Sequence, residues 1–206
     1  SYLVTGGLGG LGLKLAEELV ARQAGRIVLA GRSAPSAEAD RLLQRLRAAG
    51  AQISVVQADV SDAADCRRLL AEATRPDYPL RGLIHAAGVL ADGMITAQSW
   101  DHFERALPAK VHGAFNLHQG TRGLDLDFFV LFSSVAATTG SLGQSNYAAA
   151  NAFMNQLARH RRANGLCASS ICWGPWAEVG MAAASEDRGQ RMARDGVQSL
   201  QAEDGL

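Results

Sequence analysis

The first residues of the chain join a short apolar run to a cluster of glycines, and this junction limits the possible folds more than any other feature. Tyr2–Thr5 has the composition of a buried strand, glycines follow at positions 7, 9 and 12, and Leu11–Arg22 repeats its apolar residues at helical spacing. Glycines in such a loop permit unusual backbone angles and let a phosphate come close to the main chain. A helix that begins directly after the loop adds free amide groups and a partial positive charge. The junction therefore predicts a dinucleotide-binding loop rather than a bare turn.

The rest of the chain alternates short apolar runs with longer segments of helical periodicity. This alternation predicts an α/β fold with a Rossmann-like, doubly wound parallel sheet that is covered by helices on both faces. The expected strands are Tyr2–Thr5, Arg26–Ala30, Gln52–Gln57, Leu80–Ala86, Asp127–Ser133 and Ala168–Trp173. The expected helices are Leu11–Arg22, Glu38–Ala49, a helix with Ser61 as its N-cap, Phe103–Thr121 and Asn146–Asn164. From Ala182 onward the strand pattern is lost, and we expect a lid or the start of a further segment.

Composition excludes several classes of function. The chain has 206 residues, which suits a single domain, and a formal net charge of +0, which argues against binding to nucleic acid or to a membrane surface. No apolar run reaches the ~18 residues of a membrane helix, and we expect no signal peptide before the first strand. Cys66, Cys167 and Cys172 form no CxxC pair, and the histidines are scattered, so neither a disulfide framework nor a metal site is predicted. We expect a cytoplasmic protein whose cysteines are small buried apolar groups.

The residues after the second strand bear on which nucleotide binds. Arg32 and Ser33 stand where NAD-binding folds usually place an acidic residue for the ribose 2′-hydroxyl. A guanidinium there can hold a 2′-phosphate through a fork of charge-assisted hydrogen bonds, so Arg32 favours NADPH. The alternative is a solvated surface arginine.

Two later strand ends complete the predicted cofactor site. Asp59, before Val60, can accept from the adenine amino group or cap a helix, and both interpretations stay open. The small residues after His85 would let a ribose lie against the backbone, whereas His85 itself is expected to be packed or hydrogen-bonded rather than catalytic. The predicted cofactor-binding residues are Thr5, Gly7, Leu8, Gly9, Gly10, Leu11, Gly12, Arg32, Ser33, Asp59, Val60, Ala86, Ala87, Gly88 and Pro175.

A second group of residues suits chemistry on a carbonyl. Ser134 ends a strand, Tyr147 follows within the next helix pattern, Asn151 lies one helical turn after Tyr147, and Lys110 comes from further upstream. Reduction of a ketone leaves charge on oxygen, which requires a proton donor and hydrogen bonds directed at that oxygen. Taken singly, Ser134 can be a strand-end cap, Tyr147 a core aromatic and Lys110 a solvated helix residue.

The motifs resemble those of the short-chain dehydrogenase/reductase superfamily. Thr5–Gly12 with Ser134 and Tyr147 carries this resemblance. Asn151, however, stands where the superfamily has lysine, and the lysine is found upstream at position 110, so that lysine and asparagine are exchanged. The same exchange is typical of the ketoreductase domains of polyketide synthases and animal-type fatty acid synthases, which this chain therefore resembles. The stretches Phe132–Ala136, Gly143–Asn151 and Cys172–Trp176 are similar as well, and the similarity runs from Tyr2 to about Met181.

The resemblance implies an NADPH-dependent reductase of a β-ketoacyl thioester that is tethered to an acyl carrier protein. Tyr147 would donate the proton, the charge of Lys110 would lower the pKa of that phenol, and Ser134 would donate a second hydrogen bond to the carbonyl oxygen. Asn151 would hold Lys110 or a relay water. The alternatives are a free-standing reductase of a diffusible ketone and a catalytically silent structural ketoreductase.

The resemblance also bears on the product and on the partners. Leu90-Ala91-Asp92 keeps the last residue of the Leu-Asp-Asp stretch of R-forming domains, and Thr139 stands where S-forming domains carry tryptophan. We therefore expect the R-configured 3-hydroxyacyl product, with Leu90, Asp92, Gln144 and Trp176 at the substrate and Trp173–Trp176 shaping the pocket. Residues 1–206 would be one catalytic domain from a larger synthase, with a structural ketoreductase half and other domains in cis. Arg159–Arg162 is expected to be a solvated helix end, or alternatively a docking patch for the acidic carrier.

Overall fold

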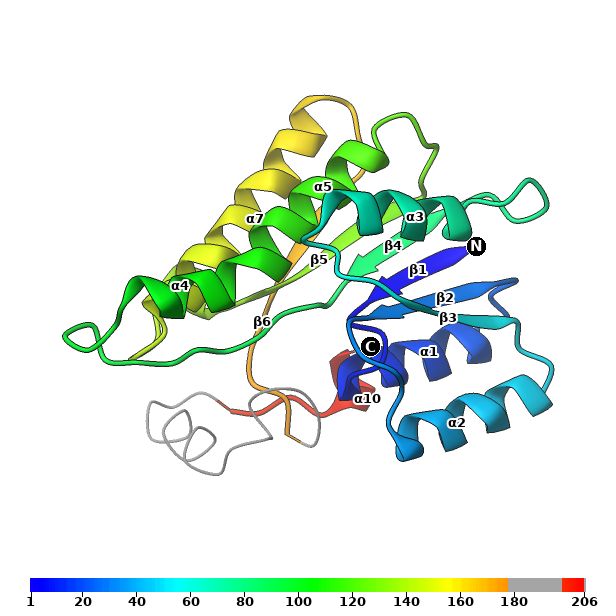
Figure 1. Cartoon of the computed structure of the whole chain (residues 1–206), viewed down its shortest axis with the longest axis horizontal. Helices are drawn as coiled ribbons and strands as arrows, with labels where there is room; N and C mark the ends of the chain where they lie inside the picture. The colour runs from blue at the N-terminus through cyan, green and yellow to red at the C-terminus, as the bar shows by residue number, and fades with distance from the viewer. Residues whose placement is uncertain (178–197, 206) are drawn as a thin grey trace.

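The computed structural model of the chain describes residues 1–177 and 198–205. Six strands form one parallel sheet in the order β3-β2-β1-β4-β5-β6. Figure 1 shows α3, α4, α5 and α7 on one side of this sheet and α1 and α2 on the other. The predicted doubly wound α/β fold is therefore confirmed. Residues 182–197, within the expected lid or continuation, lie outside the described residues.

The strands agree with the expected ones to within a residue or two, whereas the helices differ more. The strands are β1 Tyr2–Thr5, β2 Ile27–Gly31, β3 Ile53–Gln57, β4 Gly82–His85, β5 Phe128–Ser134 and β6 Ser169–Trp173. The helices are α1 Gly10–Ala21, α2 Ala37–Ala48, α3 Ala63–Ala73, α4 Trp100–Leu107, α5 Ala114–Gly120, α6 Ala136–Thr139, α7 Ser145–Ala163 and α10 Ala202–Gly205. A π-helix, Pro108–Gly113, joins α4 to α5.

Alternating side chains of the strands supply two apolar cores, one on each face of the sheet. In β1, Leu3 packs with residues of α3, α5 and α7, and Val4 packs with residues of α1 and α2. Because β1 pairs with β2 on one side and with β4 on the other, the strand order reverses beside it. In doubly wound sheets, ligands bind at the carboxyl ends of the strands next to such a reversal. The fold therefore places the candidate site above Thr5, Ala30 and His85, which lie in register.

The expected continuous helix Phe103–Thr121 is wrong. The structure divides it into α4, the π-helix Pro108–Gly113 and α5. Pro108 has no amide hydrogen and its ring crowds the preceding turn, so the ordinary hydrogen-bond pattern is interrupted there. Short π-helical turns inside helices are frequent at functional sites, and this one carries Lys110.

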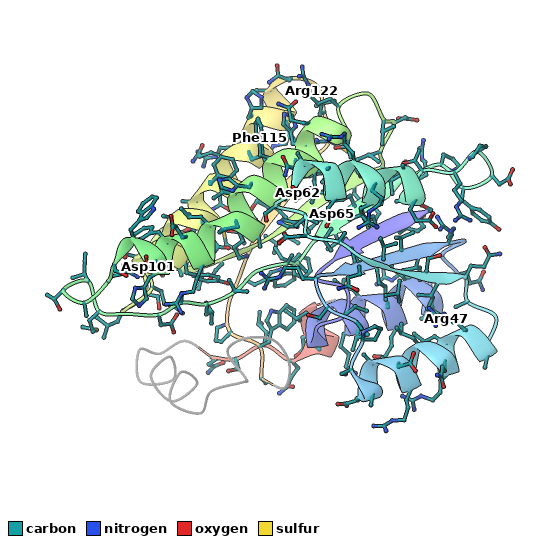
Figure 2. All side chains as sticks on the ribbon, viewed as in Figure 1. Arg47, Asp62, Asp65, Asp101, Phe115 and Arg122 are labelled. Carbon is teal, nitrogen blue, oxygen red and sulfur yellow. The ribbon has the colours of Figure 1, made fainter. Side chains whose placement is uncertain are left out.

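The N-cap of α3 is Asp62, not Ser61 as expected. The Asp62 carboxylate accepts a hydrogen bond of 2.8 Å from the amide of Asp65, and both residues are labelled at the start of α3 in Figure 2. The amide and the hydroxyl of Ser61 instead donate to Oδ1 of Asp59, at 2.9 and 2.7 Å. Asp59 therefore stabilises the turn before α3 but is not the cap of that helix.

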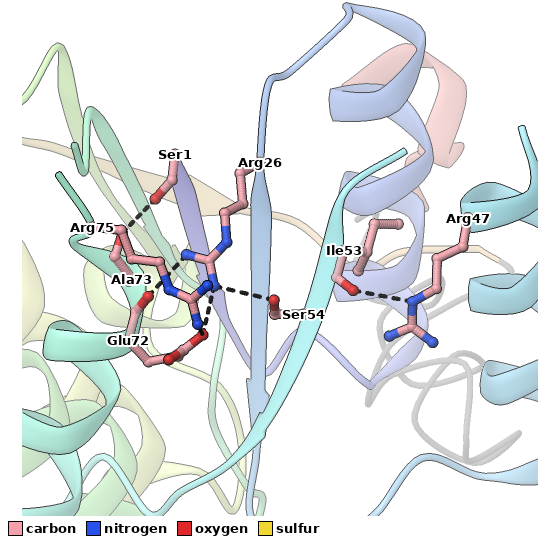
Figure 3. A network of polar contacts seen from close by, with 8 residues as sticks. All are labelled: Ser1, Arg26, Arg47, Ile53, Ser54, Glu72, Ala73 and Arg75. Carbon is pink, nitrogen blue, oxygen red and sulfur yellow. Dashed lines mark hydrogen bonds and ion pairs between the residues drawn. The ribbon is translucent and has the colours of Figure 1, made fainter. Parts of the chain in front are cut away.

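A polar network holds the amino ends of the strands together, opposite the candidate site (Figure 3). The Arg26 guanidinium donates to the backbone oxygen of Glu72 at 2.8 Å, to its carboxylate at 2.6 Å and to Oγ of Ser54 at 3.1 Å. Arg75 pairs with the same carboxylate, and the Ser1 hydroxyl donates to the Ala73 carbonyl. These contacts tie β2 and β3 to the end of α3.

Two expectations about individual side chains are corrected. Arg159, His160 and Arg162 are exposed, but Arg161 is only 1% exposed, because its guanidinium lies 3.8 Å from the centre of the Phe129 ring. Of the cysteines, Cys66 is buried, Cys167 is half-buried and Cys172 is exposed, so they are not uniformly buried apolar groups. Within residues 1–177 and 198–205, no helix is long and apolar enough to cross a membrane, and no cluster of side chains suits a metal ion.

Candidate active site

Two pockets open at the carboxyl ends of the central strands. The first, here named the tyrosine pocket, is lined by Leu11, Ala86, Leu90, Lys110, Phe132, Ser133, Ser134, Gln144, Tyr147, Trp173, Gly174, Pro175 and Trp176. The second, here named the arginine pocket, is lined by Thr5, Gly6, Ala30, Gly31, Arg32, Ala58, Asp59, Val60, Ala87, Gly88, Val89 and Ala109. Consecutive residues Ala86 and Ala87 line one pocket each, so the two pockets flank the end of β4.

Most of the predicted cofactor residues line one of these pockets. Leu11, Ala86 and Pro175 line the tyrosine pocket, whereas Thr5, Arg32, Asp59, Val60, Ala87 and Gly88 line the arginine pocket. The remaining predicted residues, Gly7, Leu8, Gly9, Gly10, Gly12 and Ser33, line neither. The structure thus brings together the predicted residues at the strand ends, whereas most of the glycine loop lies outside the two pocket linings.

The loop glycines are required by close packing and by one left-handed backbone angle. Gly6, which was not among the predicted residues, has a φ of +71°, and a Cβ there would lie 2.7 Å from the Ala87 amide nitrogen. A Cβ at Gly7 would lie 2.7 Å from the Val4 carbonyl oxygen, and one at Gly12 would collide with the Gly6 carbonyl. The Gly6-Gly7 pair was the sequence signal for this turn. Side chains at these positions would displace the loop from β1 and α1.

The start of α1 fits a dinucleotide. Its N-cap is Gly9, which supplies no side-chain cap, and its first turn carries no acidic residue. The amide groups of that turn and the positive end of the helix dipole therefore remain available to an anion such as a pyrophosphate. Among the described residues, a Cβ at Gly9 would meet the Gly6 carbonyl alone, at 3.5 Å, so the backbone there is open in the direction of that Cβ.

Arg32 lies where the ribose end of such a nucleotide would be recognised. It directly follows β2, its side chain is exposed, and it lines the arginine pocket together with Asp59 and Val60. The Arg32 carbonyl accepts 2.8 Å from Nε2 of Gln57, the last residue of β3. This bond fixes the backbone of Arg32 at the edge of the pocket.

Tyr147, Lys110 and Ser134 meet in the tyrosine pocket, as the sequence predicted. Nζ of Lys110 lies 5.3 Å from the centre of the Tyr147 ring and donates 2.8 Å to the Phe132 carbonyl. Lys110 is 2% exposed, so it is not a solvated helix residue. Oγ of Ser134 accepts from the Ala136 amide at 3.2 Å, and the same hydroxyl forms a hydrogen bond with the Tyr147 side chain.

Asn151 is buried beneath these residues rather than in the pocket lining. Its Nδ2 donates 2.7 Å to the Tyr147 carbonyl, one turn earlier in α7. Its Oδ1 is buried and has no hydrogen-bond partner among the described residues. The expectation that Asn151 holds Lys110 is therefore wrong, because the Phe132 carbonyl holds that ammonium instead. The orphan Oδ1 remains suited to accept from a water.

The two titratable groups of the pocket shift in opposite directions. Burial lowers the pKa of Lys110 to about 7. Burial also raises the pKa of Tyr147, while hydrogen bonds with Asn151 and Ser134 lower it and the charge of Asp92 raises it. We expected the cation to depress the Tyr147 pKa, but the net direction is upward because desolvation outweighs the other contributions.

His85 is a packed, hydrogen-bonded residue, as predicted. Its Nε2 lies 2.9 Å from the Ala109 carbonyl, which can only accept, so Nε2 carries the hydrogen and Nδ1 accepts from the Thr5 hydroxyl at 2.6 Å. Burial and the nearby Lys110 lower the pKa of His85 to about 3, so its ring is neutral. His85 thus joins β1 and β4 to the π-helix that carries Lys110.

The predicted substrate residues lie on the loops around the tyrosine pocket. Leu90, Gln144 and Trp176 line it, and Nε2 of Gln144 donates 3.1 Å to the Asp92 carboxylate. Trp173 packs between Phe132 and Trp176, with ring centres at 5.3 and 4.8 Å. Both tryptophans of the Trp173–Trp176 stretch therefore belong to the pocket wall.

Several pocket residues were not selected from the sequence. Phe132 and Ser133 in the tyrosine pocket, and Ala30, Gly31, Ala58, Val89 and Ala109 in the arginine pocket, are apolar or small. Side chains of these types do not indicate a functional site, so only their position at the ends of predicted strands could have identified them as pocket residues. Ala109 had no such signal, because it depends on the π-helix.

The chain is similar to domains of large synthases. The KR domain family profile matches residues 1–178. A mycocerosic acid synthase-like polyketide synthase from Mycolicibacterium smegmatis is 44% identical over 200 residues, which are 95% of this chain and 10% of that protein. A phthioceranic/hydroxyphthioceranic acid synthase from Mycobacterium tuberculosis is 43% identical over 180 residues, 87% of this chain and 8% of that synthase. The chain thus spans about a tenth of the length of these curated relatives, or less.

Solved structures agree with the sequence relatives. A structure of A-type ketoreductases from a modular polyketide synthase has a TM-score of 0.94 at 41% identity, covering 100% of this chain and 43% of that one. The first ketoreductase of the tylosin polyketide synthase has a TM-score of 0.86 at 40% identity, and the match covers 98% of this chain and 44% of that one. A short chain dehydrogenase from Mycobacterium avium shares the fold alone. Its TM-score is 0.72 at 24% identity, and the match covers 83% of this chain and 66% of that one.

Proposed function

Because this chain belongs to the KR domain family, the ketoreductases of polyketide synthases, we propose that it reduces a carrier-tethered β-ketoacyl thioester to the 3-hydroxyacyl thioester with NADPH. Domains of this family are oxidoreductases that bind a nicotinamide cofactor. The observation that carries the proposal is the tyrosine pocket, in which Tyr147, Ser134 and Lys110 converge beside a glycine loop. Residues 1–206 would act as one catalytic domain of a larger synthase.

The side chains of the tyrosine pocket divide the work on the carbonyl oxygen. When bound, a reduced nicotinamide supplies the hydride. The Tyr147 hydroxyl gives its proton to the oxygen, because a phenol whose pKa is raised stays protonated at neutral pH. The Ser134 hydroxyl donates a second hydrogen bond to the same oxygen, since its own lone pair is engaged by Ala136.

Lys110 and Asn151 restore the proton. With a pKa of about 7, Lys110 exchanges protons near neutral pH and replaces the one that Tyr147 gives up. Its short bond to the Phe132 carbonyl keeps Nζ next to the phenol ring. A water on the orphan Oδ1 of Asn151 would complete the path to Lys110.

NADPH rather than NADH is proposed from the arginine pocket. Arg32 is the basic residue at the end of β2, and a 2′-phosphate is the part of NADPH that a guanidinium fork recognises. The Asp59 carboxylate, part of the same lining, already accepts two hydrogen bonds from Ser61. Asp59 therefore offers only its second oxygen to the adenine amino group.

The partners are proposed from the family. Its members are parts of large multidomain synthases, and this chain spans about a tenth of its curated relatives, or less. The acyl carrier protein with its phosphopantetheine-linked chain, a structural ketoreductase half and other synthase domains in cis are therefore the proposed partners. The exposed Arg159, His160 and Arg162 remain the candidate docking patch for the acidic carrier.

An R-configured product is proposed from the loop residues. Asp92 is retained and is held by Gln144 at the edge of the tyrosine pocket, and Thr139 stands in place of the tryptophan. The solved relatives include ketoreductases described as A-type, so configuration has to be measured on this protein. Chiral chromatography of the reduced thioester should give mainly the R isomer, and a mainly S product would refute this assignment.

The proposal is tested by comparing three substrates in the intact protein with NADPH. These are a β-ketoacyl group on the acyl carrier protein, the same acyl group as an N-acetylcysteamine thioester, and cyclohexanone as a diffusible ketone. We expect kcat/KM to fall in that order. A preference for cyclohexanone would indicate a free-standing reductase, and no NADPH oxidation with any of the three would indicate a silent structural domain.

A further inference from the structure

Asn146, which directly precedes Tyr147, connects three separate segments around the tyrosine pocket. It is fully buried. Its Nδ2 donates 2.8 Å to the Ala91 carbonyl and 2.8 Å to the His102 carbonyl, while its Oδ1 accepts 2.8 Å from the Tyr147 amide. Ala91 belongs to the loop 89–99 that follows β4, here named the substrate loop, and His102 belongs to α4.

These bonds use both amide hydrogens and the oxygen of the side chain. The Tyr147 amide lies in the first turn of α7, where amides have no helical partner, so Asn146 supplies the acceptor. Ala91 lies between Leu90, which lines the tyrosine pocket, and Asp92, which Gln144 holds. A single side chain therefore bonds both to the backbone of Tyr147 and to the backbone of the substrate loop.

Other contacts also hold the substrate loop: Ser99 bonds to His102 at the start of α4, and two further contacts join the loop to the segment before Tyr147. The Gly93 amide donates to the Gly143 carbonyl at 2.9 Å, and the Ser145 hydroxyl donates to the Gln98 side chain. Neither contact reaches the backbone of Tyr147. The Asn146 side chain, in contrast, bonds to the backbone of the loop at Ala91 and to the backbone of Tyr147.

We propose that Asn146 is a positioning residue. It holds the substrate loop at a fixed distance from Tyr147 and so determines how the β-ketoacyl thioester enters the pocket. The inference rests on the proposed function. Because Leu90 and Asp92 move with Ala91, a loop freed from Asn146 would hold the substrate carbonyl less firmly against the Tyr147 hydroxyl. Binding of the thioester and the choice of ketone face would then suffer, whereas binding of NADPH would not.

The substitution Asn146→Asp tests the hydrogen-bond donors of this side chain separately from its acceptor. Aspartate is isosteric, keeps an acceptor for the Tyr147 amide and removes both donors to the loop and to α4. At neutral pH we expect KM for the β-ketoacyl thioester to rise on the order of tenfold, the effect of an unmade buried hydrogen bond, and the minor 3-hydroxy isomer to increase. KM for NADPH should stay unchanged and kcat should fall at most about threefold.

The KM of the same variant for the thioester should show a pH dependence that the wild-type KM lacks. A carboxylate that faces the Ala91 and His102 carbonyls in a buried site has a raised pKa, because its charged form is destabilised there. As the pH falls, that carboxyl gains a proton and can again donate to one carbonyl. The KM of the variant should therefore recover toward the wild-type value at acidic pH, which a general loss of folding would not produce.

The control is Asn164→Asp, the same amide-to-carboxylate change at the exposed C-cap of α7, whose side chain bonds to the His160 carbonyl. It should keep the wild-type KM and isomer composition. If Asn146→Asp does not fold, Asn146→Ser, which is smaller and uncharged, should show the same rise in KM without recovery at acidic pH. Failure of both variants to fold would reject a positioning role in favour of a purely structural one.

Two further outcomes separate this inference from the proposed function. If the wild type reduces the thioester and Asn146→Asp leaves KM and isomer composition unchanged, the positioning role is refuted and the proposed function stands. If the variant loses kcat and NADPH binding to the same degree as thioester binding, the positioning role is refuted as well. Absence of reduction by the wild type would refute the proposed function and the inference together.

Discussion

The ammonium of Lys110 lies 5.3 Å from the centre of the Tyr147 ring, although the two residues come from different helices. Lys110 is carried by the π-helix Pro108–Gly113, and Tyr147 by the first turn of α7. Burial lowers the pKa of the amine and raises that of the phenol, so both groups favour their neutral forms. Near neutral pH the pair therefore consists of a protonated phenol and an amine that readily exchanges protons. This combination suits donation of a proton to a substrate oxygen.

Replacing Tyr147 with phenylalanine should abolish reduction while NADPH still binds. The variant removes the proton donor and preserves the ring that packs beside Lys110. We expect kcat to fall by about a hundredfold or more, the usual contribution of a general acid, with an unchanged NADPH dissociation constant. Tyr78→Phe, in the turn before β4, is the matched control and should keep full activity. A Tyr147→Phe variant with nearly wild-type kcat would remove Tyr147 from the mechanism.

The pH dependence of turnover should report the titration of Lys110. Its pKa of about 7 means that the ammonium is charged below this pH and becomes a neutral amine above it. Because the charged form supplies the proton, kcat should fall as the pH rises through about 7. In Lys110→Met this decrease in kcat should disappear, and kcat should be low at every pH. Lys14 is exposed, so Lys14→Met should retain the wild-type dependence of kcat on pH. An unchanged decrease in Lys110→Met would assign the titration to another group.

Arg32→Ala should separate the two nicotinamide cofactors. Loss of the guanidinium removes contacts to the 2′-phosphate and leaves those to the remainder of the dinucleotide. KM for NADPH should therefore rise far more than KM for NADH. Arg45→Ala, an exposed arginine on α2 outside the arginine pocket, should change neither value. Equal effects of Arg32→Ala on both cofactors would show that Arg32 does not recognise the phosphate.

Arg161→Ala should destabilise the fold, unlike substitution of its exposed neighbour. Nε of Arg161 donates to the Cys167 carbonyl and Nη1 donates to the Thr121 hydroxyl, both at 3.1 Å, and the guanidinium packs against Phe129. Truncation leaves these acceptors unsatisfied and opens a cavity, so we expect a loss of about 2–4 kcal/mol in the free energy of unfolding.

The matched control is Arg159→Ala, on the exposed side of α7, which should change stability by about 0.5 kcal/mol or less. Urea unfolding followed by circular dichroism measures both variants. Similar values for the two would show that the buried contacts of Arg161 add little.

The sheet and most of the pocket could be predicted because their signals are local. The apolar run Tyr2–Thr5, the glycines that follow it and the reactive types of Ser134 and Tyr147 can be recognised from neighbouring residues alone. The glycines and Ser134 lie at or just after a strand end, Tyr147 lies in the first turn of α7, which comes after β5, and parallel strands bring their carboxyl ends to one edge of the sheet. A correct list of strands was therefore sufficient to place these residues close together.

The parts that could not be predicted depend on contacts between distant segments. The burial of Arg161 depends on Thr121, Phe129 and Cys167, and no pattern within Arg159–Arg162 indicates those partners. The links from Asn146 to Ala91 and His102 are likewise long-range. Apolar periodicity does not distinguish a π-helix from an α-helix, so only Pro108 indicated the break in the expected helix Phe103–Thr121.

Transfer of hydride from the cofactor to the β-carbon is the most direct measurement of the proposed reaction. The intact protein would receive a carrier-bound β-ketoacyl thioester and NADPH deuterated at C4 of the nicotinamide, with the label on one face or the other in separate reactions. We predict that one of the two labelled cofactors gives a 3-hydroxyacyl product with a single deuterium on C3, detected by mass spectrometry, and that Tyr147→Phe gives no product. A 3-hydroxyacyl product without deuterium from both labelled cofactors, or no product at all, would contradict the account.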